Sequence, residues 1–367
     1  MRIGVDARFL VEEKTGVETY FHELLSRLIR LGGEEEYVLF RGDSLMPDLP
    51  PGRWRVVGAG GRAWSWGLTA KLAGEGLDLF YSPVTAFPLA GAPRSIVTIH
   101  DLSWHHTPSS YSRLERARQS RWTALAARHA DGIVVVSEST RKDLAALHPA
   151  AAGKLTVISP GADDSCFSSV PALEVQRVRD RYGLKGRYLL ALASFHPRKN
   201  LPGLVEAYDH FRTLSPERIQ LLLAGRGGSD SARVLGRIAR SPFRDDILLS
   251  GYVPGEDLPA LYASAELFVL ISHYEGFGIP ALEAMARGTP VLVSDLPVFQ
   301  EVCGEAAIRV APDDPDAVAE GIVASIRDTP ERSSRIAEGI RRARGYRWED
   351  SATRLKGFFR HVESSAS

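Results

Sequence analysis

Residues 267–287 read LFVLISHYEGFGIPALEAMAR, and this stretch decides the fold of the chain around it. It opens with a continuous apolar run over 267–271, which indicates a strand that is buried on both faces. Two glycines follow at positions 276 and 278, and Pro280 suits the first turn of a helix that we expect over 280–287. A strand, a glycine-containing turn and a helix in this order are typical of a parallel sheet covered by helices.

The same alternation recurs along the whole chain. Short apolar runs predict two series of strands, at 2–7, 37–40, 54–57, 79–81, 95–99, 132–137 and 155–158, and then at 188–193, 220–224, 247–249, 267–271, 290–294 and 307–310. Helical patterns lie between them, for example at 18–31 and 141–147. The alternation predicts an α/β fold with two Rossmann-like domains, separated near the turn-forming residues 159–164. We expect domains at 1–165 and 166–345, with a ligand in the cleft between the carboxyl ends of the two facing sheets.

Composition narrows the class of protein. The 367 residues include 45 Lys and Arg against 45 Asp and Glu, and this balance argues against a nucleic-acid binder, which normally carries a basic excess. The two cysteines, Cys166 and Cys303, belong to no zinc-binding spacing. We see neither a secretory signal nor an apolar run long enough to span a membrane, and expect a cytoplasmic protein.

The residues around the glycine turn suggest a ligand with both phosphate and hydroxyl groups. The N–H groups of Phe277, Gly278 and Ile279 would lie at a helix N-terminus, where negative charge is favoured. Glu275 and Glu283 would repel a phosphate but accept hydrogen bonds from hydroxyls. A sugar nucleotide satisfies both requirements. The alternative is a helix whose acidic residue is stabilised by the dipole, with glycines that serve only the turn.

The spacing from Glu275 to Glu283 resembles the E-x7-E signature of the GT4 family of retaining glycosyltransferases, which have the GT-B fold. Other segments resemble parts of this family in the expected order, and together they cover nearly the whole chain: DAR at 6–8, TGVETY at 15–20, TIHDL at 98–102, VSESTR at 136–141, PRKN at 197–200, LSGYV at 249–253 and YRWE at 346–349. The resemblance implies that the first domain binds the acceptor and the second binds the nucleotide sugar. It also implies that the helix starting near residue 348, within a tail at 346–367, crosses back to the first domain.

Arg198 and Lys199 follow the strand expected at 188–193, where an α/β domain places its ligand residues. By resemblance they bind the diphosphate, and fixed cations would stabilise the charge that develops on a departing nucleoside diphosphate. Without the resemblance, a solvated basic turn would be the better interpretation. Ser194 stands where many relatives carry a further arginine, so binding would depend more on these two cations and the backbone.

Five further residues take their roles from the resemblance. His100 would orient the transferred sugar, and the backbone of Gly16 would face the donor phosphate. Glu283 would accept hydrogen bonds from the ribose, Glu275 would lie near the donor sugar, and the strand end at Val253 would lie against the base. The plainer alternatives are a buried histidine bonded to a carbonyl for His100 and a tight loop for Gly16.

The resulting hypothesis is a retaining, metal-independent glycosyltransferase. It would move a hexosyl group from GDP-mannose to a hydroxyl of a glycan or lipid-linked acceptor. Alternatives are a UDP-sugar donor, a sugar-nucleotide 2-epimerase of the same fold, and a noncatalytic nucleotide-sugar sensor, against which the pair Glu275 and Glu283 beside two cations argues. Residues 314–316 read DPD, like the metal motif of other glycosyltransferases, but we expect them to cap a helix and expect no metal or other cofactor.

The segment 111–130 carries five arginines against one glutamate, with Leu114, Trp122 and Leu125 between them. A basic, partly amphipathic helix can bind an anionic lipid surface, and this would place the protein at the inner face of the membrane. The alternative is an ordinary solvated helix face.

Overall fold

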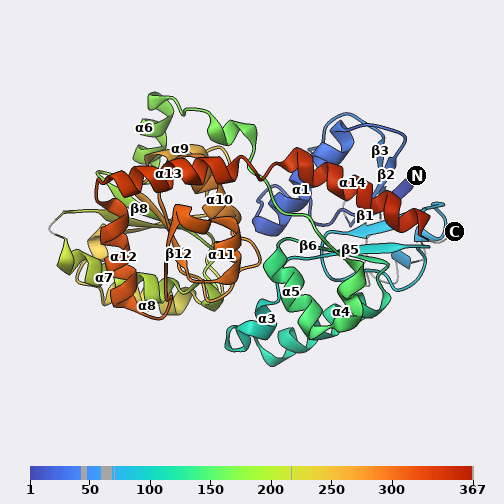
Figure 1. The fold of residues 1–367 in the computed structure, drawn as a ribbon, viewed down its shortest axis with the longest axis horizontal. Helices are drawn as coiled ribbons and strands as arrows, with labels where there is room; N and C mark the ends of the chain where they lie inside the picture. The colour runs from blue at the N-terminus through green and yellow to red at the C-terminus, as the bar shows by residue number, and fades with distance from the viewer. Residues whose placement is uncertain (43–47, 59–67, 70, 216, 366–367) are drawn as a thin grey trace. The chain divides into compact units, whose positions relative to one another are not determined.

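A computed structural model describes residues 1–42, 48–58, 68–69, 71–215 and 217–365 (Figure 1). Contacts divide the chain into two compact units. The first unit contains Met1–His105, Tyr111–Gly161 and Arg347–Ser367, and the second contains His106–Ser110 and Ala162–Tyr346.

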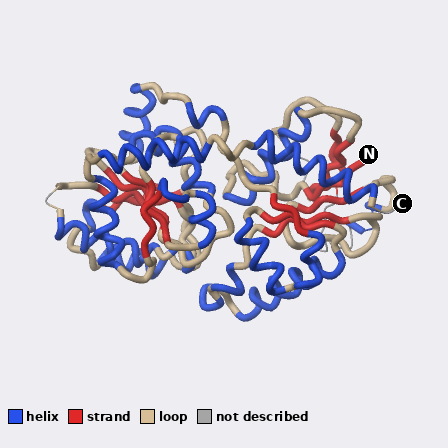
Figure 2. The backbone as a smooth tube through the Cα atoms, in the orientation of Figure 1, coloured by secondary structure: helices blue, strands red, loops and turns tan. Residues whose placement is uncertain are grey.

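The first unit is built on a parallel sheet. Among the described residues the strand order is β3-β2-β1-β4-β5-β6-β7, and every pairing is parallel. The strands are β1 Arg2–Asp6, β2 Glu36–Arg41, β3 Trp54–Gly58, β4 Leu79–Ser82, β5 Ser95–Ile99, β6 Gly132–Val135 and β7 Leu155–Val157. The central strands β4, β5 and β6 are buried along their length, because helices and loops cover both faces (Figure 2).

Helices form several of the crossovers between these parallel strands, whereas β4 and β5 are joined by a loop without a helix. The first unit has α1 Gly16–Arg30, α4 Arg113–His129, α5 Glu138–Leu147 and α14 Trp348–Ser364, and α3 Ser103–His106 ends at its border. Short 3₁₀ turns lie at η1 Pro108–Ser110, which belongs to the second unit, and at η2 Pro149–Lys154.

The C-terminal helix α14 returns to the first unit and lies against α1 (Figure 1). Arg27 Nε of α1 donates to Glu349 Oε1 at 3.1 Å, and the ring of Phe359 packs against Tyr81 of β4 with centroids 5.3 Å apart. Glu35, almost completely buried, binds Arg360 at 2.6 Å and Lys356 at 3.0 Å. Burial alone would raise the pKa of Glu35, but hydrogen bonds and charges from these two cations lower it to about 2.

The second unit repeats the architecture with its own sheet. In the described part of the chain its order is β10-β9-β8-β11-β12-β13, again all parallel. The strands are β8 Tyr188–Leu192, β9 Gln220–Ala224, β10 Ile247–Gly251, β11 Leu267–Leu270, β12 Val291–Ser294 and β13 Ala307–Val310. A core cluster that includes Leu189, Leu221 and Val269 is completely buried beneath the helices.

The helices of the second unit are α6 Ala172–Arg181, α7 Leu201–Leu214, α8 Ser231–Ala239, α9 Leu258–Ser264, α10 Ile279–Ala286, α11 Pro297–Val302, α12 Pro315–Ile326 and α13 Pro330–Ala343. The 3₁₀ turns are η3 Asp164–Phe167, η4 Pro197–Lys199, η5 Arg244–Asp246 and η6 Gly304–Ala306. None of the helices in the described residues is long and apolar enough to cross a membrane.

The fold class predicted from the sequence is confirmed, with two Rossmann-like parallel sheets and a terminal helix on the first unit. Each expected strand is present within a few residues of its predicted bounds. The apolar runs marked these strands because a parallel sheet buries both faces. Pro280 lies in the first turn of α10, as predicted.

Candidate functional site

The carboxyl edge of the second sheet brings the predicted cations and Glu275 together. Arg198 and Lys199 lie in η4, after β8, and Glu275 follows β11. Because β8 and β11 are neighbours in the sheet, their loops meet at the same edge. The two loops are joined through the backbone, where the His273 N–H donates to the Arg198 carbonyl at 2.8 Å.

Glu275 binds both cations at once. Arg198 Nη1 lies 3.0 Å from Glu275 Oε2, and Lys199 Nζ donates to Oε1. Ser272 Oγ also donates to Oε1, at 2.7 Å, and Arg198 Nη1 lies 3.0 Å from the Tyr274 carbonyl oxygen. The Glu275 side chain is 7% exposed, so these contacts replace its lost hydration.

These partners keep Glu275 ionised. Its burial alone would raise the pKa of the carboxyl, but the charges of Lys199 and Arg198 and the hydrogen bonds from Lys199 and Ser272 outweigh burial and lower the pKa to about 2. At neutral pH Glu275 is therefore an anion that accepts hydrogen bonds and does not donate one.

The glycine turn after Glu275 has the backbone that only glycine adopts without strain. Gly278 has φ 93° and ψ 53° and is the N-cap of α10, and a Cβ at this position would lie 2.6 Å from Phe299 Cε1. The side chain of Phe277 is buried and packs edge-on against Tyr346 at 5.4 Å. Ile279 begins α10, where helix geometry leaves N–H groups without helical acceptors. The predicted anion-binding segment thus has a helix N-terminus at its end.

Glu283 lies on α10 and is fixed by a tyrosine that the sequence analysis did not identify. Tyr262 of α9 is buried, and its hydroxyl donates to Glu283 Oε2 at 2.9 Å. Burial, together with the negative charge of Glu283, raises the pKa of Tyr262 well above its usual value, so the hydroxyl remains a donor. Tyr262 therefore holds the carboxylate of Glu283 in one orientation.

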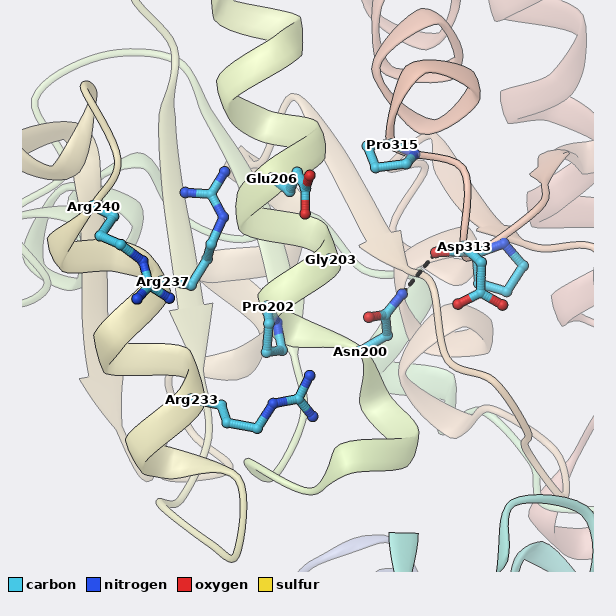
Figure 3. Close-up of a pocket in the computed structure, with 10 residues that line it drawn as sticks. Asn200, Pro202, Gly203, Glu206, Arg233, Arg237, Arg240, Asp313 and Pro315 are labelled. Carbon is cyan, nitrogen blue, oxygen red and sulfur yellow. Dashed lines mark hydrogen bonds between the residues drawn. The ribbon is translucent and has the colours of Figure 1, made fainter. Parts of the chain in front are cut away.

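Asn200 directly follows the two cations and fixes the end of their loop. Among the described residues it is the one non-glycine position with a left-handed backbone, at φ 50°. Its side-chain amide donates to the Pro312 carbonyl at 2.7 Å, and its side chain lies so close to Gly203 that a Cβ there would be 2.5 Å from Asn200 Oδ1. Asn200 lines a pocket of about 360 Å³. Figure 3 shows it with Arg233 and Arg237 of α8 and with Arg240, which directly follows that helix.

Val253, predicted to lie near the base, is buried just after β10. Its neighbour Tyr252 has the guanidinium of Arg226 over its ring, 5.0 Å from the centroid. Arg226 follows β9, the strand next to β10, so the two side chains meet at the same sheet edge as Arg198.

His100 belongs to the first unit and directly follows β5. Its Nε2–H donates to the Pro83 carbonyl at 2.8 Å, and a carbonyl can only accept, so the neutral ring carries its proton on Nε2. Its ring lies edge-on to Tyr20, with centroids 5.1 Å apart. Burial lowers the pKa of His100, although the Pro83 carbonyl opposes this. At neutral pH the ring is neutral, with Nδ1 as an acceptor.

Gly16 is exposed at the first position of α1, after a capping box in which the Thr15 N–H donates to Glu18 Oε2 at 3.0 Å. A Cβ on Gly16 would meet nothing within 4 Å. Packing within the first unit therefore does not require a glycine here.

A pocket of about 480 Å³ in the first unit includes His100 in its wall. It lies at the carboxyl ends of β1, β4 and β5, and Arg118, Gln119 and Trp122 from the middle of α4 also line it. No motif predicted this pocket, because its lining residues are spread along the chain between positions 8 and 122.

The DPD segment serves local structure. Asp314 Oδ1 accepts from the Ala317 N–H at 3.0 Å and caps α12, as predicted, while Asp316 Oδ1 lies 2.7 Å from His210 Nδ1. Among the described residues, no group of three or more His, Cys, Asp or Glu side chains is arranged to hold a metal ion.

Comparison with known proteins adds two family matches. Residues 175–342 match the model for Glycosyl transferases group 1, and residues 14–165 match the model for Glycosyltransferase Family 4. The O-antigen chain mannosyltransferase B of Escherichia coli is 29% identical over 368 residues, which cover 92% of this chain and 94% of that protein.

Solved structures share the fold. Sucrose-phosphate synthase from Thermosynechococcus elongatus superposes with a TM-score of 0.81 at 21% identity, covering all of both chains. Anabaena HepE, solved in complex with UDP and glucose, gives 0.79 at 17% identity and covers 98% of this chain and 100% of its own. At these identities the likeness concerns the fold.

Proposed function

The chain belongs to the glycosyltransferases, with a family 4 domain and a group 1 domain, and we propose that it transfers a hexosyl group from a nucleoside-diphosphate sugar to an acceptor hydroxyl. The observation that carries this proposal is the contact of Glu275 with Arg198 and Lys199 at one sheet edge. Cations and an ionised carboxylate side by side suit a ligand that presents a diphosphate and sugar hydroxyls together.

The reaction needs charge stabilisation where the leaving group departs. Arg198 and Lys199 would bind the diphosphate as its negative charge develops, and the N-terminus of α10 would favour the same charge. We propose that this replaces a metal ion. Glu275 would accept hydrogen bonds from the donor sugar and Glu283 from the ribose, while Val253 would lie near the base.

The first unit would contribute the acceptor and two further groups. His100, neutral with Nδ1 as an acceptor, would orient a sugar hydroxyl, and the backbone of Gly16 would face the donor phosphate. We propose that the anomeric configuration of the donor is retained. Comparison of the anomeric proton couplings of donor and product by NMR tests this, and an inverted product would refute it.

GDP-mannose is the donor that we favour, and polysaccharide biosynthesis is the setting. The whole-length relative from Escherichia coli is named an O-antigen chain mannosyltransferase, which supports both choices. A UDP-sugar is the alternative, in line with the UDP in the HepE structure. A 2-epimerase of the same fold would release product without an acceptor, so product analysis with and without acceptor separates it from a transferase.

The acceptor would be a glycan or a lipid-linked saccharide, reached at a membrane surface from the cytoplasmic side. Helix α4 exposes arginines around Leu114, whose own exposure is 80%. Cosedimentation with liposomes tests this contact: binding should rise with anionic lipid content and fall with salt. Binding that does not depend on the anionic lipid content would refute the proposed contact with a membrane.

The donor site is tested by isothermal titration of the purified protein with GDP, UDP, dTDP and ADP in the presence of EDTA. We expect one nucleotide to bind tightly without metal, and Lys199→Ala to weaken it about 10- to 100-fold because a charge-assisted contact is lost. Lys185→Ala, an exposed lysine of the same unit, serves as the matched control. The proposed donor site is refuted if no nucleotide binds, or if Lys199→Ala and Lys185→Ala bind the nucleotide with the same affinity.

A further inference from the structure

The second unit has a pocket that the proposed donor site does not use. Its volume is about 360 Å³, and its walls come from the start of α7, from α8 and its end, and from the loop before α12. A water molecule takes about 30 Å³ of liquid, so this space is larger than a single small ion needs. All of its lining residues belong to the second unit, so its chemistry can be described without the first.

Three arginines line this pocket from one side. Arg233, Arg237 and Arg240 follow one another at intervals of four and three residues, which places their side chains on the same face of α8 and its end. The guanidinium of Arg237 is held by the buried Asp209, with Nη2 2.7 Å from Oδ2. A guanidinium has several N–H groups, so this contact leaves donors for a ligand.

The other two arginines are more exposed. The side chain of Arg233 is 72% exposed, and its Nη1 lies 3.3 Å from Asp230 Oδ1. Arg240 is exposed and makes no ion pair among the residues that the structure describes. An arginine can bind a phosphate through two parallel N–H groups, so three guanidinium groups along one wall favour a ligand with a phosphate group.

Two carboxylates lie in the other walls of the pocket. Glu206 is exposed on α7, and Asp313 precedes α12 with its side chain 81% exposed. Figure 3 shows Asp313 across the start of α7 from the arginines. A carboxylate repels a phosphate but accepts hydrogen bonds from hydroxyls. The pocket therefore suits a ligand that has a phosphate at one end and hydroxyls at the other.

The walls of this pocket are joined to the loops of the proposed donor site. Asn200 lines the pocket directly after the two cations of that site, and its amide donates to the Pro312 carbonyl at 2.7 Å. Asp313 Oδ1 lies 3.5 Å from His273 Nδ1, and the His273 N–H donates to the Arg198 carbonyl at 2.8 Å. A ligand that fixes Asn200 and Asp313 would therefore also restrict the loops around Arg198.

We propose that this pocket is a regulatory site, which binds a sugar phosphate and thereby tightens the binding of the donor nucleotide. The arginines would hold the phosphate, and Glu206 and Asp313 would accept hydrogen bonds from the sugar hydroxyls. Affinity for the nucleotide would rise because its loops are already ordered when it arrives. By linkage, the nucleotide would tighten the binding of the sugar phosphate by the same factor. The regulation rests on the proposed function of the donor site.

The test is isothermal titration of the full chain with the 6-phosphates of mannose, glucose and galactose, in the presence of saturating nucleotide. The nucleotide occupies Arg198 and Lys199, so a phosphate that binds only to those cations is displaced. We expect at least one sugar phosphate to bind still, and inorganic phosphate to bind about tenfold more weakly because it brings no sugar hydroxyls. In the reverse titration, the sugar phosphate should tighten nucleotide binding about fivefold.

Substitutions in the arginine wall locate the binding. Arg233→Gln and Arg240→Gln should each weaken sugar phosphate binding about tenfold, because a charge-assisted contact is lost. Arg244→Gln, an exposed arginine of the same unit outside the pocket, is the matched control. Arg237 is left unchanged, because its loss would leave the buried Asp209 without its cation. Circular dichroism of each variant shows whether the fold is kept.

The inference is overturned if saturating nucleotide abolishes sugar phosphate binding, if inorganic phosphate binds as tightly as the best sugar phosphate, or if Arg240→Gln and Arg244→Gln bind alike. It is also overturned if the sugar phosphate leaves nucleotide affinity unchanged or lowers it. Failure of the proposed function is recognised separately, because titration of the same samples with nucleotide would then show no binding that depends on Lys199.

Discussion

The candidate site of the second unit and the pocket of the first unit are built from opposite kinds of side chain. In the second unit, Glu275 is bonded to Arg198, Lys199 and Ser272 before any ligand arrives. In the first unit, Phe9, Trp104 and Trp122 line the pocket beside His100, and Asp6 binds the guanidinium of Arg8. The site of the second unit is thus centred on one carboxylate between two cations, whereas the pocket of the first unit combines aromatic rings with separate polar groups.

The largest effect should come from Glu275→Gln. The substitution keeps the shape but removes the negative charge between two cations, so it should lower turnover about 10³-fold, as loss of a fixed electrostatic contact does. Affinity for the nucleoside diphosphate should be equal or higher, because the phosphate no longer competes with a carboxylate for Arg198 and Lys199. Steady-state kinetics and titration on the same variant measure both. Parallel loss of turnover and affinity would mean that Glu275 holds the phosphate-binding loop together and has no separate role.

The second prediction concerns how the stability of the folded protein depends on pH. In the folded protein the pKa of Glu275 is about 2, so its carboxyl stays deprotonated down to that pH. In the unfolded chain the same carboxyl takes up a proton near its usual pKa of 4.5. The unfolded state therefore binds more protons as pH falls through this window, and the folded state loses up to about 3 kcal/mol of stability. The Tm of the unmodified protein should fall more steeply between about pH 5 and pH 3 than that of Glu275→Gln. Identical slopes would show that the carboxylate is not fixed by its cations in solution.

Gly16→Ala addresses the first unit and changes no charge. A Cβ at this exposed position meets nothing within 4 Å, so the Tm should be unchanged or slightly higher. Turnover should still fall about tenfold if the backbone here approaches the donor phosphate, since a methyl group would block that approach. Gly153→Ala, which also has open space, is the control. Full activity of Gly16→Ala would leave Gly16 with a role in the loop alone.

The smallest effect concerns the tyrosine that orients Glu283. Tyr262→Phe removes one hydrogen bond and should weaken nucleotide binding about fivefold. Tyr188→Phe is the control: it removes a hydroxyl that donates to the Leu261 carbonyl and lies 2.9 Å from Ser264 Oγ, and it does not change the contact with Glu283. Tyr188→Phe should lose at least as much stability as Tyr262→Phe, and only Tyr262→Phe should lose affinity. Equal affinities in a titration would show that the orientation of Glu283 does not matter for the nucleotide.

The sequence predicted the helices and strands better than the side-chain contacts between them. Local sequence predicted β8 and β11, because a strand that is buried on both faces is a continuous apolar run. It also predicted the start of α10, because Pro280 lies in the first turn of that helix. The contact between Lys199 and Glu275 joins residues 76 apart, and it depends on β11 pairing with β8 after the chain has formed β9 and β10. No local pattern encodes that order.

Other parts of the site left no signal in the sequence at all. Ser272 and Tyr262 are ordinary residue types whose roles arise only from the carboxylates that they contact. Asn200, which has a left-handed backbone, donates through its amide to the carbonyl of Pro312, a residue 112 positions away. The pocket around His100 combines residues spread from position 8 to position 122, so the sequence did not show that they line one space.

The return of α14 to the first unit has a consequence for how the protein is made. Most of the second unit, Ala162–Tyr346, lies in the chain between Gly161 and Arg347 of the first, so a ribosome synthesises the second unit before the first can be completed. Leu355 and Phe359 are fully buried in the first unit, and Lys356 and Arg360 neutralise the buried Glu35. Until those residues emerge, the early part of the chain lacks the apolar cover of Leu355 and Phe359, and Glu35 lacks its two cations. We therefore expect the first unit to reach its final packing only after the last helix has been synthesised.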